Sequence, residues 1–308
     1  MVRHFLDLFT VGSEACRLIV DHARSRKDAR ADLPRGAVDA DRPLSNHALA
    51  LIFEKPSTRT RVSFQMAMHQ LGGTCLTLSG AELQLGRGET IEDTARVMSR
   101  YVDALMLRTA SHATVTDLAR ASAVPVINGL TDLNHPCQAL ADVMTFEEHR
   151  GTVAGSTWAW LGDGNNMANA LIEAAGVFGF HIRLGVPTSH LPNAAVVEQA
   201  RACGSTITFC PSADDAVAGV DAVATDTWVS MGQIGGAAKL AAMKPYQVTA
   251  PLMAKASPEA LFLHCLPAHR GEEVTDAVID GPQSIVWDEA ENRLHAQKAI
   301  LLWCLNCL

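Results

Sequence analysis

The chain is 308 residues long, which corresponds to about two domains at roughly 150 residues each. Hydrophobic residues make up 48% of it and charged residues 19%, so the chain can bury a sizeable core, and disorder is excluded as its main state. The net charge of −8 argues against a nucleic acid or an anionic membrane as partner, because clustered Lys and Arg bind both of these.

The predicted elements alternate between short apolar strands and helices along nearly the whole chain. Residues Ala48–Phe53 are typical of a buried strand, and Ser57–Leu71 continues with helical spacing. Because strands that alternate with helices form parallel sheets, the predicted fold class is α/β, with doubly wound parallel sheets and a long C-terminal helix. Further strands are predicted at Ala104–Leu107, Val124–Ile127, Thr157–Leu161, Ile182–Val186, Thr206–Phe209, Ala222–Ala224, Leu261–Leu263 and Ile285–Trp287, and further helices at Ile91–Tyr101, Cys137–His149, Asn165–Phe178, Ala194–Cys203 and Glu289–Leu305.

A single doubly wound sheet rarely requires so many residues, so we expect two α/β domains. Residues 1–134 would form the first domain and residues 135–288 the second. The crossing is placed at the helix led by Pro136, since proline suits the first turn of a helix. The C-terminal helix, about residues 289–308, is expected to join the first domain.

The cysteines and the first residues of the chain indicate where in the cell the protein is expected. The eight cysteines are scattered, and Asp7 places an acid where a signal peptide would be apolar, so we expect a cytoplasmic protein with reduced thiols. No apolar run approaches the ~18 residues that span a bilayer, and no membrane partner is expected. Cys304 and Cys307 have the spacing of a metal-binding pair, but no second pair accompanies them. Buried thiols are favoured there, and no metal site is predicted.

The strongest motif is the run Ser-Thr-Arg-Thr-Arg at residues 57–61, where a buried strand ends and a helix opens. Backbone N–H groups, hydroxyls and a guanidinium at the positive end of a helix form an anion site. The alternative is that Ser57 is only an N-cap. Because a cap needs one hydroxyl and this motif holds several donors, phosphate binding is the favoured interpretation.

Three weaker motifs lie at later junctions between predicted strands and helices. His135 and Gln138 share one face of a first helical turn and could hold a carbonyl oxygen and an amide nitrogen, although a packed loop histidine explains His135 equally well. Cys265 follows a predicted strand, at the end where open α/β sheets bind ligands, but a cysteine is often simply buried. Asp226 and Ser230 follow another strand, four residues apart, and could recognise an ammonium group.

Residues Gly162–Met167 are similar to the dinucleotide-binding fingerprint, which requires a third glycine. Residue 167 is methionine, so a nicotinamide cofactor is disfavoured. An NAD-dependent dehydrogenase is therefore kept only as an alternative of a different class. A strand, a turn and a helix are still expected at this position.

Taken together and in this order, four motifs resemble the carbamoyltransferase family. They are Ser-Thr-Arg-Thr-Arg from residue 57, His-Pro-Cys-Gln from residue 135, Asp-x-x-x-Ser-Met-Gly from residue 226 and His-Cys-Leu-Pro from residue 264. The resemblance extends from His4 to Ala299, nearly the whole chain. All carbamoyltransferases share the first two motifs, whereas the last two resemble the ornithine enzymes of the family.

The resemblance implies a reaction and an assembly. Carbamoyl phosphate would transfer its carbamoyl group to the δ-amine of L-ornithine, giving L-citrulline and phosphate. The pathway would be arginine biosynthesis or, as the second choice, the catabolic arginine deiminase pathway. A homotrimer with shared active sites is also implied. No cofactor is expected, because the leaving phosphate already makes the carbonyl reactive.

The resemblance also assigns a role to individual residues. The catalytic residues would be Arg108, His135, Asp226 and Cys265. Ornithine would be bound by Asn166, Asp226, Ser230 and Met231. Carbamoyl phosphate would be bound by Ser57, Thr58, Arg59, Thr60, Arg108, His135, Gln138, Cys265, Leu266 and Arg293, together with Gln84 from a neighbouring subunit.

Two alternatives stand beside this hypothesis. A sibling carbamoyltransferase would act on putrescine, N-acetylornithine or aspartate. The Ser-Met-Gly sequence disfavours putrescine, because it suits the head of an α-amino acid. A non-catalytic regulatory relative is the other alternative, and the complete set of catalytic residue types argues against it.

Overall fold

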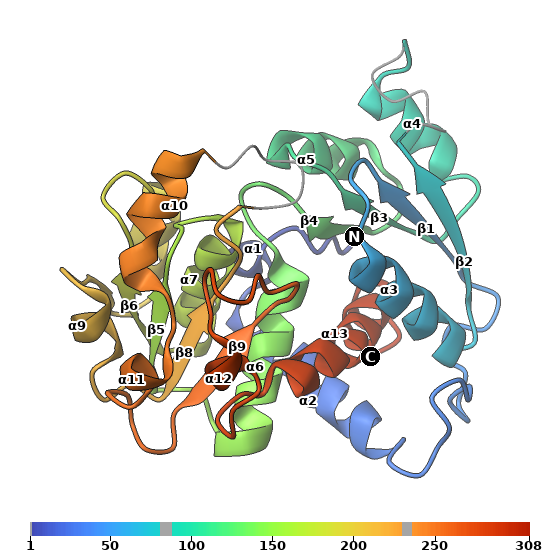
Figure 1. The fold of residues 1–308 in the computed structure, drawn as a ribbon. Helices are drawn as coiled ribbons and strands as arrows, with labels where there is room; N and C mark the ends of the chain where they lie inside the picture. Colours follow the sequence, from blue (N-terminus) through green and yellow to red (C-terminus); the bar gives the residue numbers. More distant parts are fainter. Residues whose placement is uncertain (1, 81–87, 230–235) are drawn as a thin grey trace. The chain divides into compact units, whose positions relative to one another are not determined.

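The computed structural model describes residues 2–80, 88–229 and 236–308. The chain divides into two compact units, of which unit 1 comprises Met1–Met144 and Asn292–Leu308 and unit 2 comprises Thr145–Glu291. Both crossings fall inside long helices, α6 (Pro136–Arg150) and α13 (Val286–Cys304). Each unit holds a parallel sheet with helices packed on it (Figure 1). The two α/β units and the long C-terminal helix confirm the predicted fold class.

Unit 1 is built on a four-stranded sheet with the order β2-β1-β3-β4. Its strands are β1 (Ala48–Phe53), β2 (Thr74–Ser79), β3 (Ala104–Arg108) and β4 (Val126–Leu130), and neighbouring strands are parallel. The chain moves outward from β1 to β2 and then returns to the other side of β1. The direction of winding therefore reverses between β1 and β3, and ligands bind open α/β sheets at such a switch point.

Helices cover both faces of this sheet. Ala50 and Ile52 of β1 pack against α4 (Ile91–Met98) and α5 (His112–Ala121) in one apolar cluster. Side chains alternate along a strand, so the intervening residues face the other side, where α3 (Thr58–Gln70) lies (Figure 1). The unit 1 part of α13 is fastened to α3, since Arg293 donates to Thr60 and Lys298 donates to Gln70. The remaining helices of this unit are α1 (Leu8–Val11) and α2 (Ser13–Asp28).

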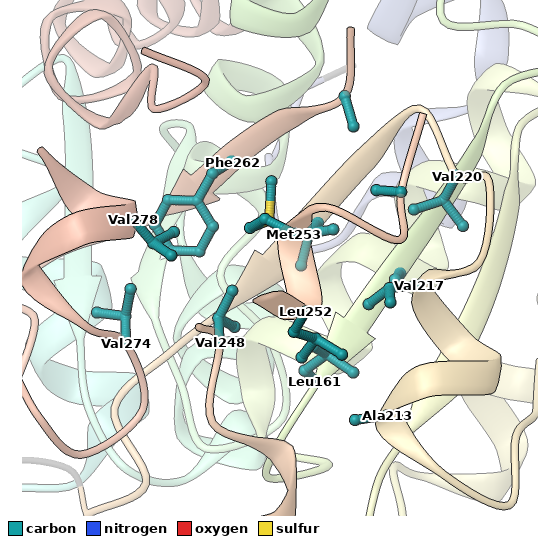
Figure 2. Packing of buried hydrophobic residues seen from close by; sticks show 14 of the residues in the cluster. Leu161, Ala213, Val217, Val220, Val248, Leu252, Met253, Phe262, Val274 and Val278 are labelled. Carbon is teal, nitrogen blue, oxygen red and sulfur yellow. The ribbon is translucent and has the colours of Figure 1, made fainter. Parts of the chain in front are cut away.

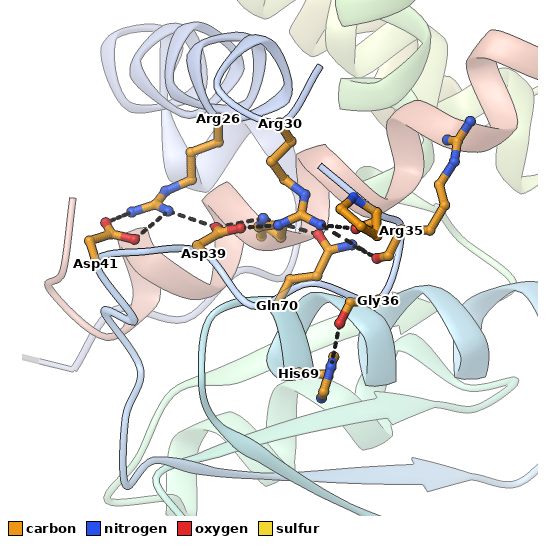
Figure 3. A network of polar contacts seen from close by, with 10 residues as sticks. Arg26, Arg30, Arg35, Gly36, Asp39, Asp41, His69 and Gln70 are labelled. Carbon is orange, nitrogen blue, oxygen red and sulfur yellow. Dashed lines mark hydrogen bonds and ion pairs between the residues drawn. The ribbon is translucent and has the colours of Figure 1, made fainter. Parts of the chain in front are cut away.

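A polar network joins α2 to the segment that precedes β1 (Figure 3). The carboxylate of Asp39 accepts from Arg26 at 2.9 Å and from Arg30, and Arg26 also bonds Asp41 at 2.6 Å. The backbone N–H of Asp39 donates to the carbonyl of Gln70 at the end of α3. The network therefore anchors a long connection that has no regular structure of its own.

Unit 2 is built on a five-stranded sheet with the order β7-β6-β5-β8-β9, again parallel throughout. The chain winds from β5 out to β7 and then resumes on the other side of β5, so the switch point lies between β5 and β8. The strands are β5 (Thr157–Leu161), β6 (His181–Gly185), β7 (Ile207–Phe209), β8 (Ala222–Thr225) and β9 (Leu261–His264).

The two faces of β5 show how this sheet is covered. Leu161 faces a cluster with Phe262, Val217 and Leu252 (Figure 2). Trp158 points to the other face and packs between Phe146 and Phe180, with ring centroids 5.0 and 4.8 Å away. The helices of unit 2 are α7 (Asn166–Phe178), α8 (Ala194–Ala202), α9 (Ala213–Val217), α10 (Ala237–Met243), η1 (Lys244–Tyr246), α11 (Ala250–Met253) and α12 (Asp276–Ile279).

One strand prediction was wrong, and one strand was not predicted. The predicted strand Ile285–Trp287 does not form: the preceding Ser284 makes an isolated bridge to Phe262, and α13 begins at Val286, because the acids that follow favour a first helical turn. Strand β2 was not predicted, since an edge strand that is partly exposed carries mixed polar and apolar residues. Within the described ranges, no helix is both long enough and apolar enough to cross a membrane.

Candidate active-site residues in the two units

The Ser-Thr-Arg-Thr-Arg motif lies at the switch point of unit 1, between the end of β1 and the start of α3. Ser57 occupies the N-cap position with an extended backbone, but its hydroxyl makes no capping bond within the part of the chain that the structure describes. The first turn of α3 therefore presents its N–H groups without a side-chain cap. This arrangement favours anion binding over the simple capping interpretation.

Arg108 is the last residue of β3 and lies opposite Phe53, the last residue of β1. The segment between them is tied together, because the Glu54 N–H donates to the Arg108 carbonyl at 3.0 Å and the Thr109 hydroxyl donates to the Glu54 carboxylate at 2.5 Å. The parallel register of β1 and β3 thus brings Arg108 to the same edge of the sheet as the end of β1, which the motif follows. Sequence analysis assigned no role to Glu54, which directly follows the predicted strand.

His135, Thr60 and Arg293 form the buried part of this site. Arg293 donates to the Thr60 hydroxyl at 2.8 Å, although the two residues are 233 positions apart in the chain. Burial, and then the positive charges of Arg293 and Arg108, hold the pKa of His135 well below its usual value. The imidazole is therefore neutral at pH 7, with one N–H to donate.

The turn that precedes α6 is stabilised by the neighbour of His135, and not by the His135 side chain. Asn134 does this, since its side chain accepts from Asn128 at 2.7 Å and its backbone carbonyl accepts from Thr131 at 3.0 Å. His135 is 4% exposed, and its Nδ1 has no hydrogen-bond partner within the described residues. Gln138, fully buried on the same first turn of α6, donates to Asp142 at 2.8 Å. The packed-loop interpretation of His135 is therefore disfavoured.

The second group of residues lies at the switch point of unit 2. Asp226 follows β8 and is 8% exposed. Its carboxylate accepts from Asn165 at 2.9 Å, from the Thr227 N–H at 2.7 Å and from the Cys265 thiol at 3.2 Å. Sequence analysis gave Asn165 no binding role, although an asparagine at the start of a predicted helix is a typical N-cap signal. The structure thus places a carboxylate and a thiol, 39 residues apart, in direct contact.

Asp226, Cys265 and His264 lie close enough to be considered as metal ligands. Both ring nitrogens of His264 are engaged, however, because Nδ1 accepts from the Leu266 N–H at 2.9 Å and Nε2 lies 3.1 Å from Glu273. A metal ion would have to displace one of these bonds. Only the Asp226 carboxylate and the Cys265 thiol are then left as possible ligands of this group. This pair suits an ammonium group better than a metal ion.

The turn from Gly162 to Asn165 does not present a dinucleotide site. The Asn165 side chain accepts from the N–H groups of Met167 and Ala168, so α7 has its own cap where a pyrophosphate would bind. A Cβ atom on Gly164 would lie only 2.3 Å from the backbone nitrogen of Pro192, so the surface of this glycine is covered by its own chain. These contacts argue against the dehydrogenase alternative.

The other predicted residues are placed as follows. Thr58 and Arg59 begin α3, and Asn166 begins α7 beside Asn165. Leu266 follows Cys265 with a φ of +55° and precedes a cis Leu266–Pro267 bond. Gln84, Ser230 and Met231 lie outside the described residues.

Unit 1 thus gathers hydrogen-bond donors and arginines that suit an anion, and unit 2 places a carboxylate beside a thiol, which suits a cation; this pairing is typical of transferases with two substrates. Residues 3–148 match the family domain described as "Aspartate/ornithine carbamoyltransferase, carbamoyl-P binding domain". Residues 154–304 match "Aspartate/ornithine carbamoyltransferase, Asp/Orn binding domain". The chain belongs to the aspartate/ornithine carbamoyltransferase family.

Individual relatives agree with this assignment. The chain is 60% identical to an ornithine carbamoyltransferase of Rhizorhabdus wittichii, covering 100% of both chains, and 58% identical to that of Rhizobium johnstonii, covering 99% of both. Among solved structures, an ornithine carbamoyltransferase from Pyrococcus furiosus matches with a TM-score of 0.94 and 46% identity. That match covers 99% of this chain and 98% of the other.

Proposed function

We propose that this protein is a carbamoyltransferase that transfers the carbamoyl group of carbamoyl phosphate to the δ-amine of L-ornithine, giving L-citrulline and phosphate. The observation that carries the proposal is the uncapped start of α3 beside Arg108, together with a neutral His135 whose Nδ1 has no hydrogen-bond partner within the described residues. A phosphate dianion and an adjacent carbonyl oxygen match these donors. Relatives up to 60% identical over their full length carry the name of this activity.

Unit 1 is proposed to hold the donor. Ser57, Thr58, Arg59 and Thr60 would bind the phosphate through the first turn of α3, where the helix dipole favours negative charge. Arg108, Thr60 and His135 would donate to the carbonyl oxygen as it gains negative charge, and removing one such donor typically costs about 3 kcal/mol of barrier. Gln138 would accept from the carbamoyl NH₂. Arg293 would complete the carbamoyl phosphate contacts, and its bond to Thr60 supports this role.

Unit 2 is proposed to hold ornithine, whose δ-amine must lose a proton before it can attack. With a lysine-like pKa of ~10.4, only about one amine in 2500 is neutral at pH 7. Asp226 and Cys265 are the groups proposed to face this nitrogen, and the thiol already donates to the carboxylate. Asn166, Ser230 and Met231 are proposed to bind the α-amino acid head, and the backbone carbonyls of Cys265 and Leu266 to contact the carbamoyl NH₂.

The test is a substrate panel. Citrulline formation from carbamoyl phosphate would be measured with ornithine, and carbamoylation would be measured in parallel with putrescine, N-acetylornithine and aspartate. We expect turnover with ornithine and less than about one per cent of that rate with the other three. Preference for another amine would overturn the acceptor assignment and keep the donor site. The absence of turnover with all four would contradict the proposed activity.

We also propose a homotrimer in which Gln84 of one subunit reaches the active site of a neighbour. Exposed apolar side chains on neighbouring elements support self-association, namely Val62 of α3 and Leu76 of the edge strand β2, which are 47% and 53% exposed. Sedimentation equilibrium would give the mass. Mixed refolding of inactive Gln84→Ala and Arg108→Ala chains should restore part of the activity, because some shared sites would then contain both native residues. Equal inactivity of the hybrid would exclude sharing.

The location and pathway are further parts of the proposal. None of the eight cysteines, all of which lie in the described ranges, forms a disulfide, which supports a reducing compartment such as the cytoplasm. A biosynthetic role is proposed over a catabolic one. A strain that lacks the protein should then need arginine or citrulline for growth, and growth without either would favour the catabolic pathway.

A further inference from the structure

His264 is the last residue of β9, and its side chain is buried within unit 2. Its Nδ1 lies 2.9 Å from the backbone nitrogen of Leu266, and its Nε2 lies 3.1 Å from Oε1 of Glu273. A backbone N–H can only donate, so Nδ1 must be the acceptor. The proton of the neutral ring therefore sits on Nε2 and is donated to Glu273.

Glu273 orients this ring and closes the loop that follows it. The same Oε1 also accepts the backbone N–H of His269 at 2.5 Å. The carboxylate is fully buried, and the backbone of Glu273 is held in turn, because its carbonyl accepts from the Val248 N–H at 2.8 Å. One buried oxygen thus fixes both the ring of His264 and the middle of the loop at residues 265–273.

The hydrogen bond that the Leu266 N–H donates to His264 lies at a residue with an unfavourable backbone conformation. Leu266 has a φ of +55°, which lies in the left-handed region that a leucine disfavours. On the other side of Cys265, the backbone N–H of His264 donates to Glu289 at 2.8 Å. Cys265 therefore lies between two hydrogen-bonded backbone N–H groups, those of His264 and Leu266. The Cys265 thiol donates to Asp226.

We propose that His264 is a positioning residue for ornithine binding: its ring, oriented by Glu273, holds the backbone of Cys265 and Leu266 so that the Cys265 thiol meets Asp226. His264 does not touch substrate. The inference rests on the proposed function, because it assigns an ornithine contact to Cys265.

Two substitutions separate the two bonds of the ring. Asparagine places an amide oxygen near the position of Nδ1, so His264→Asn keeps an acceptor for the Leu266 N–H. Glutamine reaches toward Glu273 instead, so His264→Gln leaves the Leu266 N–H without its acceptor. We expect His264→Gln to raise the KM for ornithine at least about tenfold, while His264→Asn stays within about threefold of wild type. The Kd for inorganic phosphate, measured by calorimetry, should change less than about twofold in both variants, because the phosphate is proposed to bind at the first turn of α3 in unit 1.

A second readout does not depend on turnover. The alkylation rate of Cys265 by iodoacetamide would be followed by peptide mass spectrometry, with the exposed Cys203 as internal reference. We expect His264→Gln to raise the relative rate of Cys265 at least about threefold and His264→Asn to leave it near wild type. Equal rates in all three proteins would overturn the positioning role. Wild-type protein that fails to use ornithine would contradict the proposed function, while alkylation would still test the position of the thiol.

If circular dichroism shows that a His264 variant does not fold, a pair of substitutions at Glu273 tests the same network. Oε2 of Glu273 has no hydrogen-bond partner within the described residues, so the side chain can lose its charge without breaking a second contact there. Glu273→Gln keeps an acceptor oxygen and should behave like wild type. Glu273→Met keeps the length without the acceptor and should raise Cys265 alkylation and the KM for ornithine. Identical behaviour of the two variants would overturn the proposal.

Discussion

At the scale of single residues, neighbours in one motif have separate roles. Asn134 accepts hydrogen bonds from Asn128 and Thr131, and these bonds stabilise the turn before α6. The Nδ1 of His135 has no hydrogen-bond partner within the described ranges, and the pKa of this histidine is lowered by burial and by two arginines. A histidine kept neutral beside two positive charges can donate to a carbonyl oxygen without adding a third charge to the site. Adjacent positions therefore divide the structural support of the turn from the contact proposed for the substrate.

Arg108 gives the sharpest prediction at this scale. Arg108→Ala should lower kcat by about a hundredfold or more, because it removes a charged donor from the proposed carbamoyl phosphate site. Arg120→Ala is the matched control, since Arg120 lies at the surface of the same unit and pairs with Asp117, three residues earlier in the same helix. Steady-state kinetics and thermal melts would be measured for both. An Arg108→Ala protein that keeps more than about a tenth of wild-type turnover would contradict the assigned role.

At the scale of elements, the N-termini of three helices differ in how their first backbone N–H groups are capped. Helices α7 and α8 begin with asparagines, Asn165 and Asn193, whose side chains accept two backbone N–H groups each. Ser57 occupies the N-cap position of α3, but no side chain caps the first turn of this helix within the described ranges. The N–H groups that α7 and α8 satisfy internally are therefore left for a ligand at α3. A serine at an N-cap position therefore does not by itself show that its side chain caps the helix.

This difference predicts opposite effects for two cap substitutions. Asn193→Ala should lower the free energy of unfolding by about 1 kcal/mol, because it removes capping bonds, and should leave carbamoyl phosphate binding unchanged. Ser57→Ala should change the free energy of unfolding by less than about 0.5 kcal/mol and raise the Kd for carbamoyl phosphate. Urea unfolding and calorimetry would distinguish the two. A loss of stability in Ser57→Ala comparable to that in Asn193→Ala would favour the simple N-cap interpretation.

At the scale of the whole molecule, charges from distant parts of the chain hold unit 1 together. Lys298 of α13 is fully buried and bonds Asp39 at 2.7 Å and Gln70 at 3.1 Å. Asp39 also pairs with Arg26 of α2 and with Arg30, two residues beyond the end of that helix (Figure 3). Burial lowers the pKa of Lys298 from 10.5 to about 8, against the opposing effect of the Asp39 carboxylate. The fold thus keeps a lysine whose charge is less stable than in water.

The substitution Lys298→Met should change the pH dependence of the free energy of unfolding, because it removes the buried charge. Between pH 8 and 10.5 the unfolded chain holds the Lys298 proton more tightly than the folded one, so wild-type stability should rise with pH in this window. The variant should lack that rise. At pH 7 its free energy of unfolding should lie within about 2 kcal/mol of wild type, because Asp39 keeps two arginines. Urea unfolding at four pH values would measure both, and parallel curves for the two proteins would contradict the prediction.

Much of the architecture follows from the sequence because strand and helix periodicities are local properties. The alternation that begins at Ala48–Phe53 predicted two doubly wound sheets, and the structure confirms them. The motifs at residues 57, 135, 226 and 264 each follow a strand or open a helix, and their residue types pointed to an anion site and an ammonium site. Local pattern was misleading at Ile285–Trp287, where apolar residues that suit a strand begin α13 instead.

Only the tertiary structure decided which residues meet. Strand order is set by hydrogen bonds between segments far apart in the chain, and no local pattern encodes it. The order β2-β1-β3-β4 places Arg108 opposite Phe53, and β7-β6-β5-β8-β9 places the turn with Asn165 beside Asp226. The sequence by itself therefore determined the chemistry that each unit can hold. The winding of each sheet determined where its switch point lies, and hence which of these groups come within bonding distance.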